Sequence, residues 1–410
     1  MSDVITVAGA GFSGLTTAYF LVKKGFKVRI LEQAARRGGL IHTIRTQHGL
    51  VETAANGLLA SARVEDMCAD IGVPLIAARR EARRRFIYRG KPRQVPLTIG
   101  DVLTVSGRVA LNLVRLSPGR GETLGAWSRR VLGNGVTDYL LAPALGGIYA
   151  GDPNRLSASL IFGKAKLPDQ LNTSKPAKGK LHGTVAPPEG MQQLIDGLVA
   201  YLSKNGVEFD VASDQATAAD QPLVACLSAS AAAKYLEVIA PDLSRALSSI
   251  EMLSLATVTC FYSPDSAQLE GFGCLFPRDQ GFRARGVLFN DFIFEGRGPA
   301  HAETWIFGGA LDGDVVNLSD DQFAETIAAE RERFYGRHDE PLAMQVTRWP
   351  RTLPHYTIEL EETLTTLPAP PDNVALVGNY LGRIGLAKIL ERAALVADRL
   401  AGTPPASWVW

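Results

Sequence analysis

The order of apolar and polar residues predicts a strand, a helix and a second strand at the start of the chain. Residues 4–8 form a short apolar run, which is typical of a buried strand. A glycine-rich turn follows, and apolar residues then recur at helical spacing until Gly25. Residues 27–32 alternate as a second strand. This order indicates a parallel, doubly wound sheet, so we expect a mixed α/β fold.

The rest of the chain shows both kinds of periodicity. Apolar positions at helical spacing predict helices within 98–116, 190–202, 319–335 and 386–400. Short apolar or alternating runs predict strands at 207–211 and 374–377 and antiparallel strands within 250–310. Residues 170–188, rich in Lys, Gly, Pro and Thr, read as a loop.

Composition narrows the classes of protein. With 410 residues, 46% of them hydrophobic and 21% charged, the chain is long enough for two or three globular domains. Its 43 basic and 42 acidic residues give no overall charge that would favour nucleic acid. The four cysteines are scattered, which favours buried thiols in a reducing compartment. The six histidines do not cluster at metal spacings, so we expect no metal site.

A glycine motif follows the first strand and carries the strongest chemical signal. The pattern GxGxxG is formed by Gly9, Ala10, Gly11, Phe12, Ser13 and Gly14. In such a turn the first glycine permits a tight bend, the second lets the backbone approach a pyrophosphate, and the third lets helix and strand pack closely. The helix that follows offers free amides and the positive end of its dipole to phosphates. We therefore expect a dinucleotide here.

Two further elements indicate which dinucleotide is bound. Glu32 ends the second strand and is expected to bind a ribose diol. A glycine pair, Gly38 and Gly39, follows shortly after it. Near the other end of the chain, the segment from Leu376 to Leu386 reads as a strand, a glycine turn and a helix start, a second nest of amides. Two such remote elements suit a long ligand, and we predict FAD.

Taken together, the motifs resemble those of the protoporphyrinogen oxidase family, within the flavin-dependent amine oxidase superfamily. The likeness runs over nearly the whole chain. It is carried by the segments GIYAGDP at 147–153, GMQQL at 190–194, GFG at 271–273 with Pro277-Arg278, RWP at 348–350 with LPHY at 353–356, and GNY at 378–380 with Gly385-Leu386.

This resemblance implies an oxidase that removes electrons from a reduced tetrapyrrole, protoporphyrinogen IX or coproporphyrinogen III, and passes them through FAD to molecular oxygen in haem biosynthesis. It implies that residues 9–14 and Glu32 hold FAD. Further cofactor contacts carried over from the family are Gly39, Leu40, Asn56, Gly57, Val211, Asn379, Ile384, Gly385 and Leu386. We assign no catalytic proton-transfer residue, since hydride transfer to a flavin requires none.

Arg85 and Gly147 are the expected substrate contacts. Arg85 precedes an aromatic residue at the place where the resemblance implies an arginine that holds a propionate, and guanidinium binds carboxylate bidentately. Gly147 lies in the segment that would line the same cavity. The surrounding arginine run can also be read as a solvated basic face, or as a surface attracted to anionic lipid.

We expect three parts. The FAD-binding domain is discontinuous, formed by 1–60, 190–250 and 365–410. Residues 61–145 form a helical, membrane-type insertion that contacts either the substrate or the membrane, and 146–189 with 251–364 form a mixed-sheet substrate domain. No run of about 18 apolar residues is present. We therefore expect a cytoplasmic protein, with peripheral contact to the inner face of the membrane as an option.

Two alternatives to a porphyrinogen oxidase remain open. One is a related FAD enzyme, a desaturase or an amine oxidase, acting on another apolar substrate. The other is a homologue that binds flavin or tetrapyrrole without turnover. The oligomeric state is not encoded in any pattern that we recognise.

Overall fold

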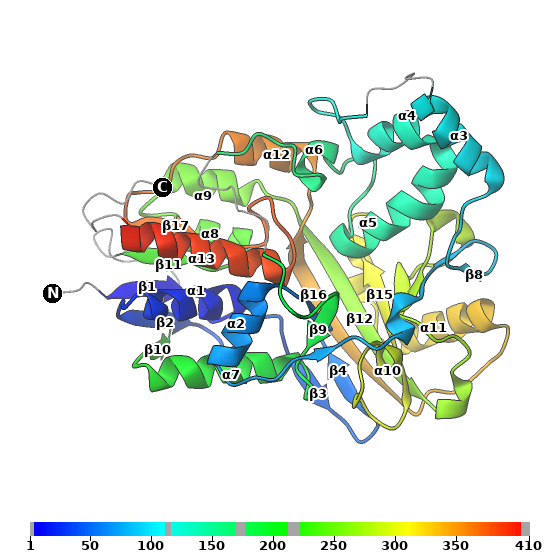
Figure 1. The fold of residues 1–410 in the computed structure, drawn as a ribbon, viewed down its shortest axis with the longest axis horizontal. Helices are drawn as coiled ribbons and strands as arrows, with labels where there is room; N and C mark the ends of the chain where they lie inside the picture. The colour runs from blue at the N-terminus through cyan, green and yellow to red at the C-terminus, as the bar shows by residue number, and fades with distance from the viewer. Residues whose placement is uncertain (1–3, 111–115, 169–176, 212–221, 403–410) are drawn as a thin grey trace.

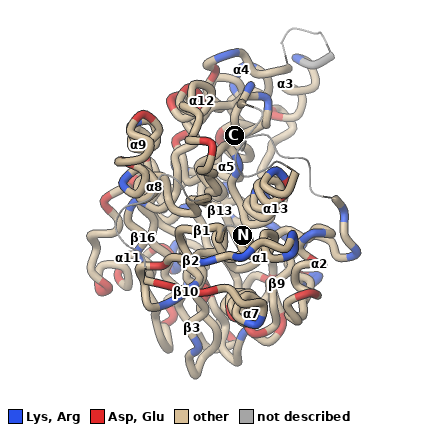
Figure 2. Tube along the Cα trace, turned by 90° about the vertical axis from the view of Figure 1, so that its left-hand side faces the viewer, with Lys and Arg blue, Asp and Glu red and all other residues tan. Residues whose placement is uncertain are grey.

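The computed structural model describes residues 4–110, 116–168, 177–211 and 222–402. Figure 1 shows a parallel sheet with its helices on the left, a larger and mostly antiparallel sheet on the right, and a group of helices above that larger sheet. The expectation of a mixed α/β fold is confirmed. Charges of both signs are scattered over the side of the molecule that faces the viewer in Figure 2, in keeping with the balanced composition.

The parallel sheet joins segments that lie far apart in the sequence. Its strand order is β10–β2–β1–β11–β17, and each neighbouring pair is parallel. The bounds are β1 Ile5–Ala8, β2 Val28–Glu32, β10 Glu208–Val211, β11 Leu223–Ala225 and β17 Val374–Leu376. Because the strands are parallel, the turns after β1, β2 and β17 all leave the sheet at the carboxyl ends of its strands. Ligands bind at this end of such sheets, and we call it the carboxyl edge of the sheet.

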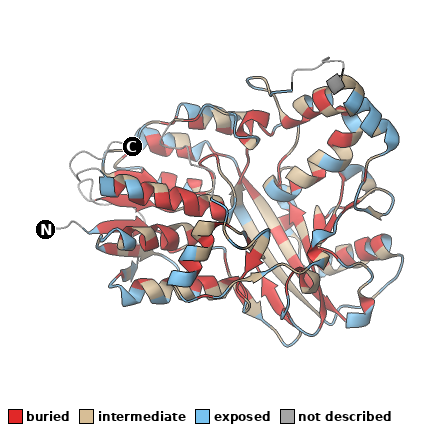
Figure 3. Ribbon diagram, in the orientation of Figure 1, coloured by how far each residue is buried: buried red, intermediate tan, exposed pale blue. Residues whose placement is uncertain are grey.

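Helices cover both faces of this sheet. One face packs against α1 (Phe12–Lys23), α7 (Met191–Lys204) and α13 (Leu386–Gly402), and the other against α8 (Ala229–Leu236) and α9 (Pro241–Ser248). The alternation in β11 shows the division, because Val224 belongs to the first core while Leu223 and Ala225 belong to the second. Figure 3 shows the buried residues gathered between these layers.

The larger sheet has the strand order β16–β12–β15–β14–β13–β7–β8. Its bounds are β7 Arg85–Tyr88, β8 Pro92–Arg93, β12 Met252–Tyr262, β13 Gly273–Leu275, β14 Gly286–Phe289, β15 His301–Gly308 and β16 Ala343–Pro354. Neighbours are antiparallel except β13 and β7. Helix α11 (Asp320–Tyr335) covers one face; it begins at a Ser319–Gln322 capping box.

The remaining elements connect these sheets. The helical group consists of α3 (Ile99–Ala110), α4 (Leu124–Val136), a π-helical turn (Thr137–Leu141) and α5 (Ala142–Tyr149). Shorter helices are α2 (Ala62–Asp70), α6 (Ala158–Ile161), α10 (Asn290–Ile293) and α12 (Ile358–Thr365). Two small sheets are formed by β3 (Thr43–Arg45) with β4 (Leu50–Glu52), and by β5 (Leu58–Leu59), β9 (Thr184–Ala186) and β6 (Ile76–Ala77).

The expected membrane-type insertion at 61–145 is the part of the fold that the structure does not support. Helices are present there, but the same stretch also contains the strands β7 and β8. The backbone of β7 pairs with β13 of the larger sheet, and β8 pairs with β7. Within the described ranges, no helix is long and apolar enough to cross a membrane. The end of the expected helix, at 111–115, and the first part of the expected loop, at 170–176, lie outside the described residues.

Candidate functional site

The turn between β1 and α1 leaves open space at one of its three motif glycines. A Cβ on Gly14 would lie 1.8 Å from the carbonyl oxygen of Gly9, and one on Gly9, where φ is +100°, would lie 2.7 Å from the carbonyl oxygen of Cys226. These two glycines are needed for the fold itself. A Cβ on Gly11 would meet only the Cα of Gly39, at 3.8 Å. The space beside Gly11 is therefore available to a ligand.

The amino end of α1 faces this space without a side-chain cap. Gly11 is the N-cap residue, and the first turn, which includes Phe12 and Ser13, holds no acidic residue. The amides there keep their capacity to bind an anion, which the helix dipole favours. The turn thus fits a pyrophosphate, as the sequence predicts for residues 9–14.

Glu32 lies at the carboxyl end of β2, directly beside this turn. Its carboxylate accepts hydrogen bonds from the amide of Ala10 at 2.7 Å and from that of Ala34 at 2.9 Å. The two amides hold the carboxylate at the edge of the sheet, and its remaining lone pairs can accept from ribose hydroxyls. The structure therefore places Glu32 where a ribose next to a pyrophosphate on Gly11 would lie.

The second glycine pair packs onto the first. The Gly38 amide donates to the carbonyl of Ala10 at 2.8 Å, and a Cβ on Gly39 would lie 3.1 Å from the Cα of Gly11. Arg36 holds this loop through the carbonyl of Ile41, at 2.7 Å. Leu40, which follows the pair, is exposed. Gly39 thus lies beside the open space at Gly11.

Val211 and the loop at Asn56–Gly57 are two further expected cofactor contacts. Val211 ends β10 opposite Glu32 in register, and its side chain is 85% exposed; the segment that follows, 212–221, lies outside the described residues. Gly57 is fixed by close packing, since a Cβ there would lie 2.8 Å from the carbonyl oxygen of Val185. Asn56 is partly exposed.

The loop from β17 to α13 brings the C-terminal candidates to the same edge. The hydroxyl of Tyr356 donates to the carbonyl of Asn379, which ties this loop to the larger sheet. Gly385 has φ +96°, and nothing lies within 4 Å of the position of its Cβ. Leu386 is the first residue of α13, and Ile384 is partly exposed. This edge therefore carries a second helix amino end beside an open glycine.

The larger sheet has a second face, opposite α11, that other elements cover only in part. On the face under α11, Phe86, Cys274, Val287 and Trp305 are buried in one core. The alternate residues point the other way. On this second face Leu275 and Ile306 are only partly buried and belong to none of the hydrophobic cores. The sheet therefore presents partly exposed apolar side chains, the surface that an apolar ligand needs.

Two bonds attach that face to the loop before Asn56. The indole Nε1 of Trp349, on β16, donates to the carbonyl oxygen of Thr53 at 2.8 Å, and the hydroxyl of Thr257, on β12, donates to the same oxygen at 3.1 Å. In Figure 3 the edge strand β16 is largely of intermediate burial, whereas its neighbour β12 is mostly buried. The apolar face and the candidate FAD loop are thus held next to each other.

Arg85 lies at the edge of this second face. It shares the side of β7 opposite to Phe86, and its guanidinium stands 4.6 Å from the ring centre of Phe272. Of the nearby arginines, Arg84 forms an ion pair with Glu270, and Arg89 forms one with Asp101. Among the described residues, Arg85 has no carboxylate within ion-pair distance. It is exposed and available to an anionic ligand.

Gly147 lies at the carboxyl end of α5, where this helix meets the sheet. A Cβ on Gly147 would lie 2.9 Å from the side chain of Leu275 on β13. Since Gly273 and Arg85 are register partners on β13 and β7, Gly147 and Arg85 approach the same strand pair. The structure thus brings the two expected substrate contacts to one part of the sheet.

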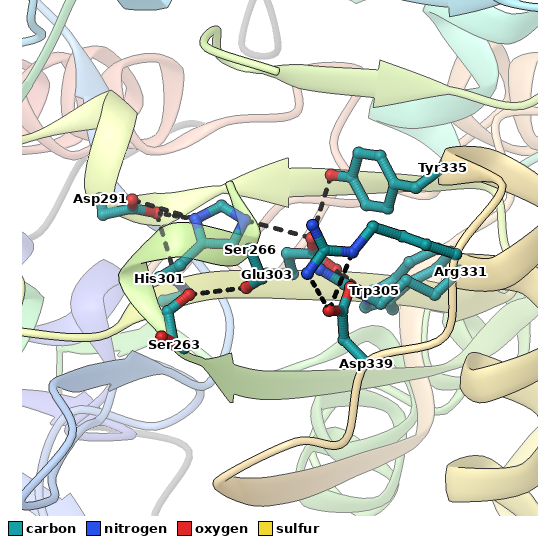
Figure 4. A network of polar contacts seen from close by, with 11 residues as sticks. Ser263, Ser266, Asp291, His301, Glu303, Trp305, Arg331, Tyr335 and Asp339 are labelled. Atoms are coloured by element: carbon teal, nitrogen blue, oxygen red, sulfur yellow. Dashed lines mark hydrogen bonds and ion pairs between the residues drawn. The ribbon is translucent and has the colours of Figure 1, made fainter. Parts of the chain in front are cut away.

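The opposite face of the sheet holds a buried ionic network. Figure 4 shows His301 between Asp291 and Glu303, with both ring nitrogens 3.1 Å from carboxylate oxygens. Arg331 and Tyr335, from α11, also bind Glu303, at 3.1 and 3.0 Å. Burial lowers the pKa of His301, but its hydrogen bonds to the two carboxylates outweigh burial and raise it to about 9. Because these side chains share the face of Trp305, the network supports the sheet from behind.

A surface pocket of about 570 Å³ lies outside the candidate site, as the ionic network does. Its lining includes Arg84, Glu270, Phe292 and Phe86, and Phe86 belongs to the core under α11. The pocket therefore opens beside the covered face of the sheet.

Comparison with known proteins decides the family. The model of the flavin containing amine oxidoreductase family matches residues 12–386. The chain belongs to this family. It is an FAD-dependent oxidoreductase, and the open turn at Gly11, the carboxylate of Glu32 and the loops at 53–57 and 378–386 fit that cofactor.

Individual relatives cover nearly the whole chain. Chloroplastic protoporphyrinogen oxidase of Nicotiana tabacum is 25% identical over 97% of this chain and 85% of its own length. Coproporphyrinogen III oxidase of Propionibacterium freudenreichii is also 25% identical, over 98% of this chain and 92% of its own. A provisionally named protoporphyrinogen oxidase from Exiguobacterium sp. 255-15 has a crystal structure that superposes with a TM-score of 0.77 at 20% identity, covering 98% and 99% of the two chains. The likeness to the protoporphyrinogen oxidases that the sequence showed is confirmed.

The sequence did not single out several positioning residues of this flavoenzyme. Arg285 donates to the carbonyls of Gly146, Gly308 and Gly151, and so fixes the end of α5 against the sheet. Burial lowers the pKa of Arg285 to about 10, with the charge of Arg278 acting in the same direction. Trp349 belongs to the RWP segment of the family resemblance, but that motif did not indicate what its side chain binds. No sequence motif marked Arg285, because its partners are backbone carbonyls from remote segments.

Proposed function

We propose that this flavoenzyme oxidises a porphyrinogen to the corresponding porphyrin, with molecular oxygen as the final electron acceptor. The observation that carries the proposal is an unpaired cation, Arg85, at the rim of a partly exposed apolar sheet face, opposite the loops that fit FAD. A porphyrinogen joins a broad apolar ring to carboxylate side chains, so it complements both features. The names of the relatives support the same substrate class.

The chain's own residues bind and orient the substrate. Arg85 pairs with one propionate and fixes the ring on the sheet, while Leu275 and Ile306 contact its apolar body and exclude water. When bound, FAD would supply the two-electron acceptor chemistry that the side chains cannot. Conversion of a porphyrinogen to a porphyrin removes six electrons and six protons. Three molecules of oxygen take them up and form three of hydrogen peroxide.

An amine oxidase is the second candidate, and one observation favours it. The rings of Tyr149 and Tyr356 lie 5.0 Å apart, and Tyr356 contacts the FAD loop at Asn379. Aromatic side chains beside a flavin suit a small amine. However, the positive charge of Arg383 acts on both tyrosines and repels an ammonium group. Formation of hydrogen peroxide with simple primary amines, but not with porphyrinogens, would favour this candidate.

Peripheral membrane contact is a further part of the proposal. The surface at the start of α3 exposes Val95, Ile99, Val102 and Leu103, at 72%, 81%, 50% and 66%. Apolar side chains on a helix near basic residues can enter a lipid interface. Sedimentation of the protein with anionic vesicles, but not in their absence, would support this contact, and replacement of Ile99 and Leu103 by serine should abolish it.

Aerobic turnover tests the main proposal. The FAD-loaded protein is mixed with protoporphyrinogen IX or coproporphyrinogen III, and porphyrin fluorescence is followed against a flavin-free control. A rise that depends on FAD supports the proposal. The absence of a rise with both substrates, in protein shown to hold FAD, refutes it.

A further inference from the structure

Arg383 is a second cation without a carboxylate partner. It lies in the loop between β17 and α13, half-buried, and its hydrogen bond is a long one of 3.4 Å to the carbonyl of Gly382. Within the part of the chain that the structure describes, no ion pair joins it to a carboxylate. A half-buried guanidinium whose donors have few protein partners is available to the oxygens of an anionic ligand.

The surroundings of Arg383 show where its guanidinium points. A Cβ on Gly163 would lie 3.3 Å from its Nη1, so the group reaches across to the segment after α6. Burial raises the pKa of Tyr149 and Tyr356, and the charge of Arg383 opposes this rise in both. The next basic residue along that segment, Lys164, is exposed and adds to the positive charge. Arg383 therefore reaches toward the segment after α6, and Tyr356 contacts the same loop at Asn379.

Helix α5 connects the surroundings of Arg383 with those of Arg85. Gly147 contacts Leu275, on the strand that pairs with the strand of Arg85. Two residues later, Tyr149 packs on Tyr356 within the field of Arg383. The last turn of α5 thus contacts β13, the neighbour of the strand of Arg85, and also Tyr356, which is bonded to the loop of Arg383 at Asn379.

We propose that Arg383 binds a second carboxylate of the substrate and makes the site selective for a porphyrinogen with four carboxylates. This inference rests on the proposed function and deepens it. Coproporphyrinogen III carries propionates around its whole ring, so one can pair with Arg85 while another reaches Arg383. Protoporphyrinogen IX has two propionates on neighbouring pyrroles, which both lie on the Arg85 side. An arginine pairs bidentately with carboxylate, which gives direction as well as affinity.

The test compares Arg383→Met, Arg383→Lys and Arg85→Met, with Arg245→Met as a matched control. Arg245 is 78% exposed on α9, far from this loop in sequence, and also loses one positive charge. For each protein, FAD content, kcat and KM for both porphyrinogens, and the Kd for coproporphyrin III from fluorescence anisotropy are measured. The anisotropy measurement needs no turnover.

We expect Arg383→Met to raise the KM for coproporphyrinogen III and the Kd for coproporphyrin III by about tenfold or more, the loss of a charge-assisted hydrogen bond. Its KM for protoporphyrinogen IX and its FAD content should change less than about twofold. Arg383→Lys should recover part of the affinity, and Arg245→Met should match the unmodified protein.

The outcomes separate the two proposals. If the unmodified protein oxidises coproporphyrinogen III but Arg383→Met leaves its KM and Kd unchanged, or changes both substrates equally, this inference is overturned and the proposed function stands. If Arg383→Met loses FAD, the guanidinium serves the cofactor instead, which also overturns the inference. If the unmodified protein, with FAD bound, oxidises neither porphyrinogen, the proposed function fails and the inference fails with it.

Discussion

Replacement of Gly11 by alanine is expected to change FAD affinity and apoprotein stability in opposite directions. Gly11 has φ −73° and ψ −179°, a conformation that alanine adopts without strain. A Cβ there would meet only the Cα of Gly39, at 3.8 Å, an ordinary contact. Removing a glycine from the unfolded chain then stabilises the apoprotein by about 0.4–1 kcal/mol.

The same Cβ projects into the space that fits the pyrophosphate. Forcing an extra methyl group into a packed contact costs roughly 1–3 kcal/mol. At about 1.4 kcal/mol per tenfold change, the Kd for FAD should rise about 5- to 150-fold. Gly107→Ala is the matched control, since nothing lies within 4 Å of its Cβ position on α3. It should leave FAD affinity unchanged.

The assay has two readouts on flavin-free protein. Urea unfolding followed by circular dichroism gives the stability of the apoprotein, and quenching of flavin fluorescence on titration gives the Kd for FAD. If Gly11→Ala binds FAD as tightly as the unmodified protein, the pyrophosphate does not lie on this turn. If it unfolds at lower urea, the space beside Gly11 is needed for the fold, and the interpretation of the turn is refuted.

Four further results are expected. Gly14→Ala should prevent folding to a soluble apoprotein, because its Cβ would lie 1.8 Å from a carbonyl oxygen, and a folded variant by circular dichroism would contradict this packing. Arg85→Met should raise the KM for a porphyrinogen about tenfold at unchanged FAD content, and an unchanged KM would remove its role. Trp349→Phe should weaken FAD binding about fivefold, because it removes a hydrogen bond of about 1 kcal/mol to the loop at Thr53. An unchanged Kd for FAD would show that this loop keeps its position without the bond. The pKa of His301 is about 9 in the folded protein and about 6.5 in the unfolded chain, so its contribution to stability is complete below pH 6.5 and is lost as the pH rises toward 9. The difference in free energy of unfolding in urea between the unmodified protein and His301→Gln should therefore shrink over that range of pH. A difference that stays constant would count against a charged His301.

The local parts of the fold could be predicted from the sequence. Strand β1, the glycine turn and α1 follow one another within about twenty residues, and each has its own signal in periodicity or glycine placement. The same holds for α11, whose capping box and terminal glycine mark both ends. Where short-range sequence alone decides the conformation, the expectation and the structure agree.

Strand β7 shows where such reasoning fails. Residues 85–88 pair in parallel with β13, about 190 residues further along the chain, and no local pattern reveals that register. The helical reading of 61–145 therefore missed the sheet strands inside it. The face on which Arg85 lies follows from this pairing, and so could not be derived from the arginine run alone.

From the residues themselves, the candidate site could be derived only where a motif is contiguous, and the remote members such as Arg85 and Asn56 came from the family resemblance. The residues at 9–14 and Glu32 come from one βαβ unit, whereas the bond from Trp349 to Thr53 spans almost three hundred positions. Arg285 binds backbone carbonyls, whose positions depend on the completed fold. Such contacts leave no trace in residue type, because any residue has a carbonyl group.

The central claim is that a porphyrinogen gives its electrons directly to the bound FAD. The most direct test is to mix the FAD-loaded protein with coproporphyrinogen III or protoporphyrinogen IX without oxygen and to follow the absorbance of oxidised flavin together with porphyrin fluorescence. We predict that the flavin absorbance falls as the porphyrinogen is consumed, and that admitting air restores it and completes porphyrin formation. A flavin absorbance that stays constant with both substrates, in protein that holds FAD, would contradict the claim.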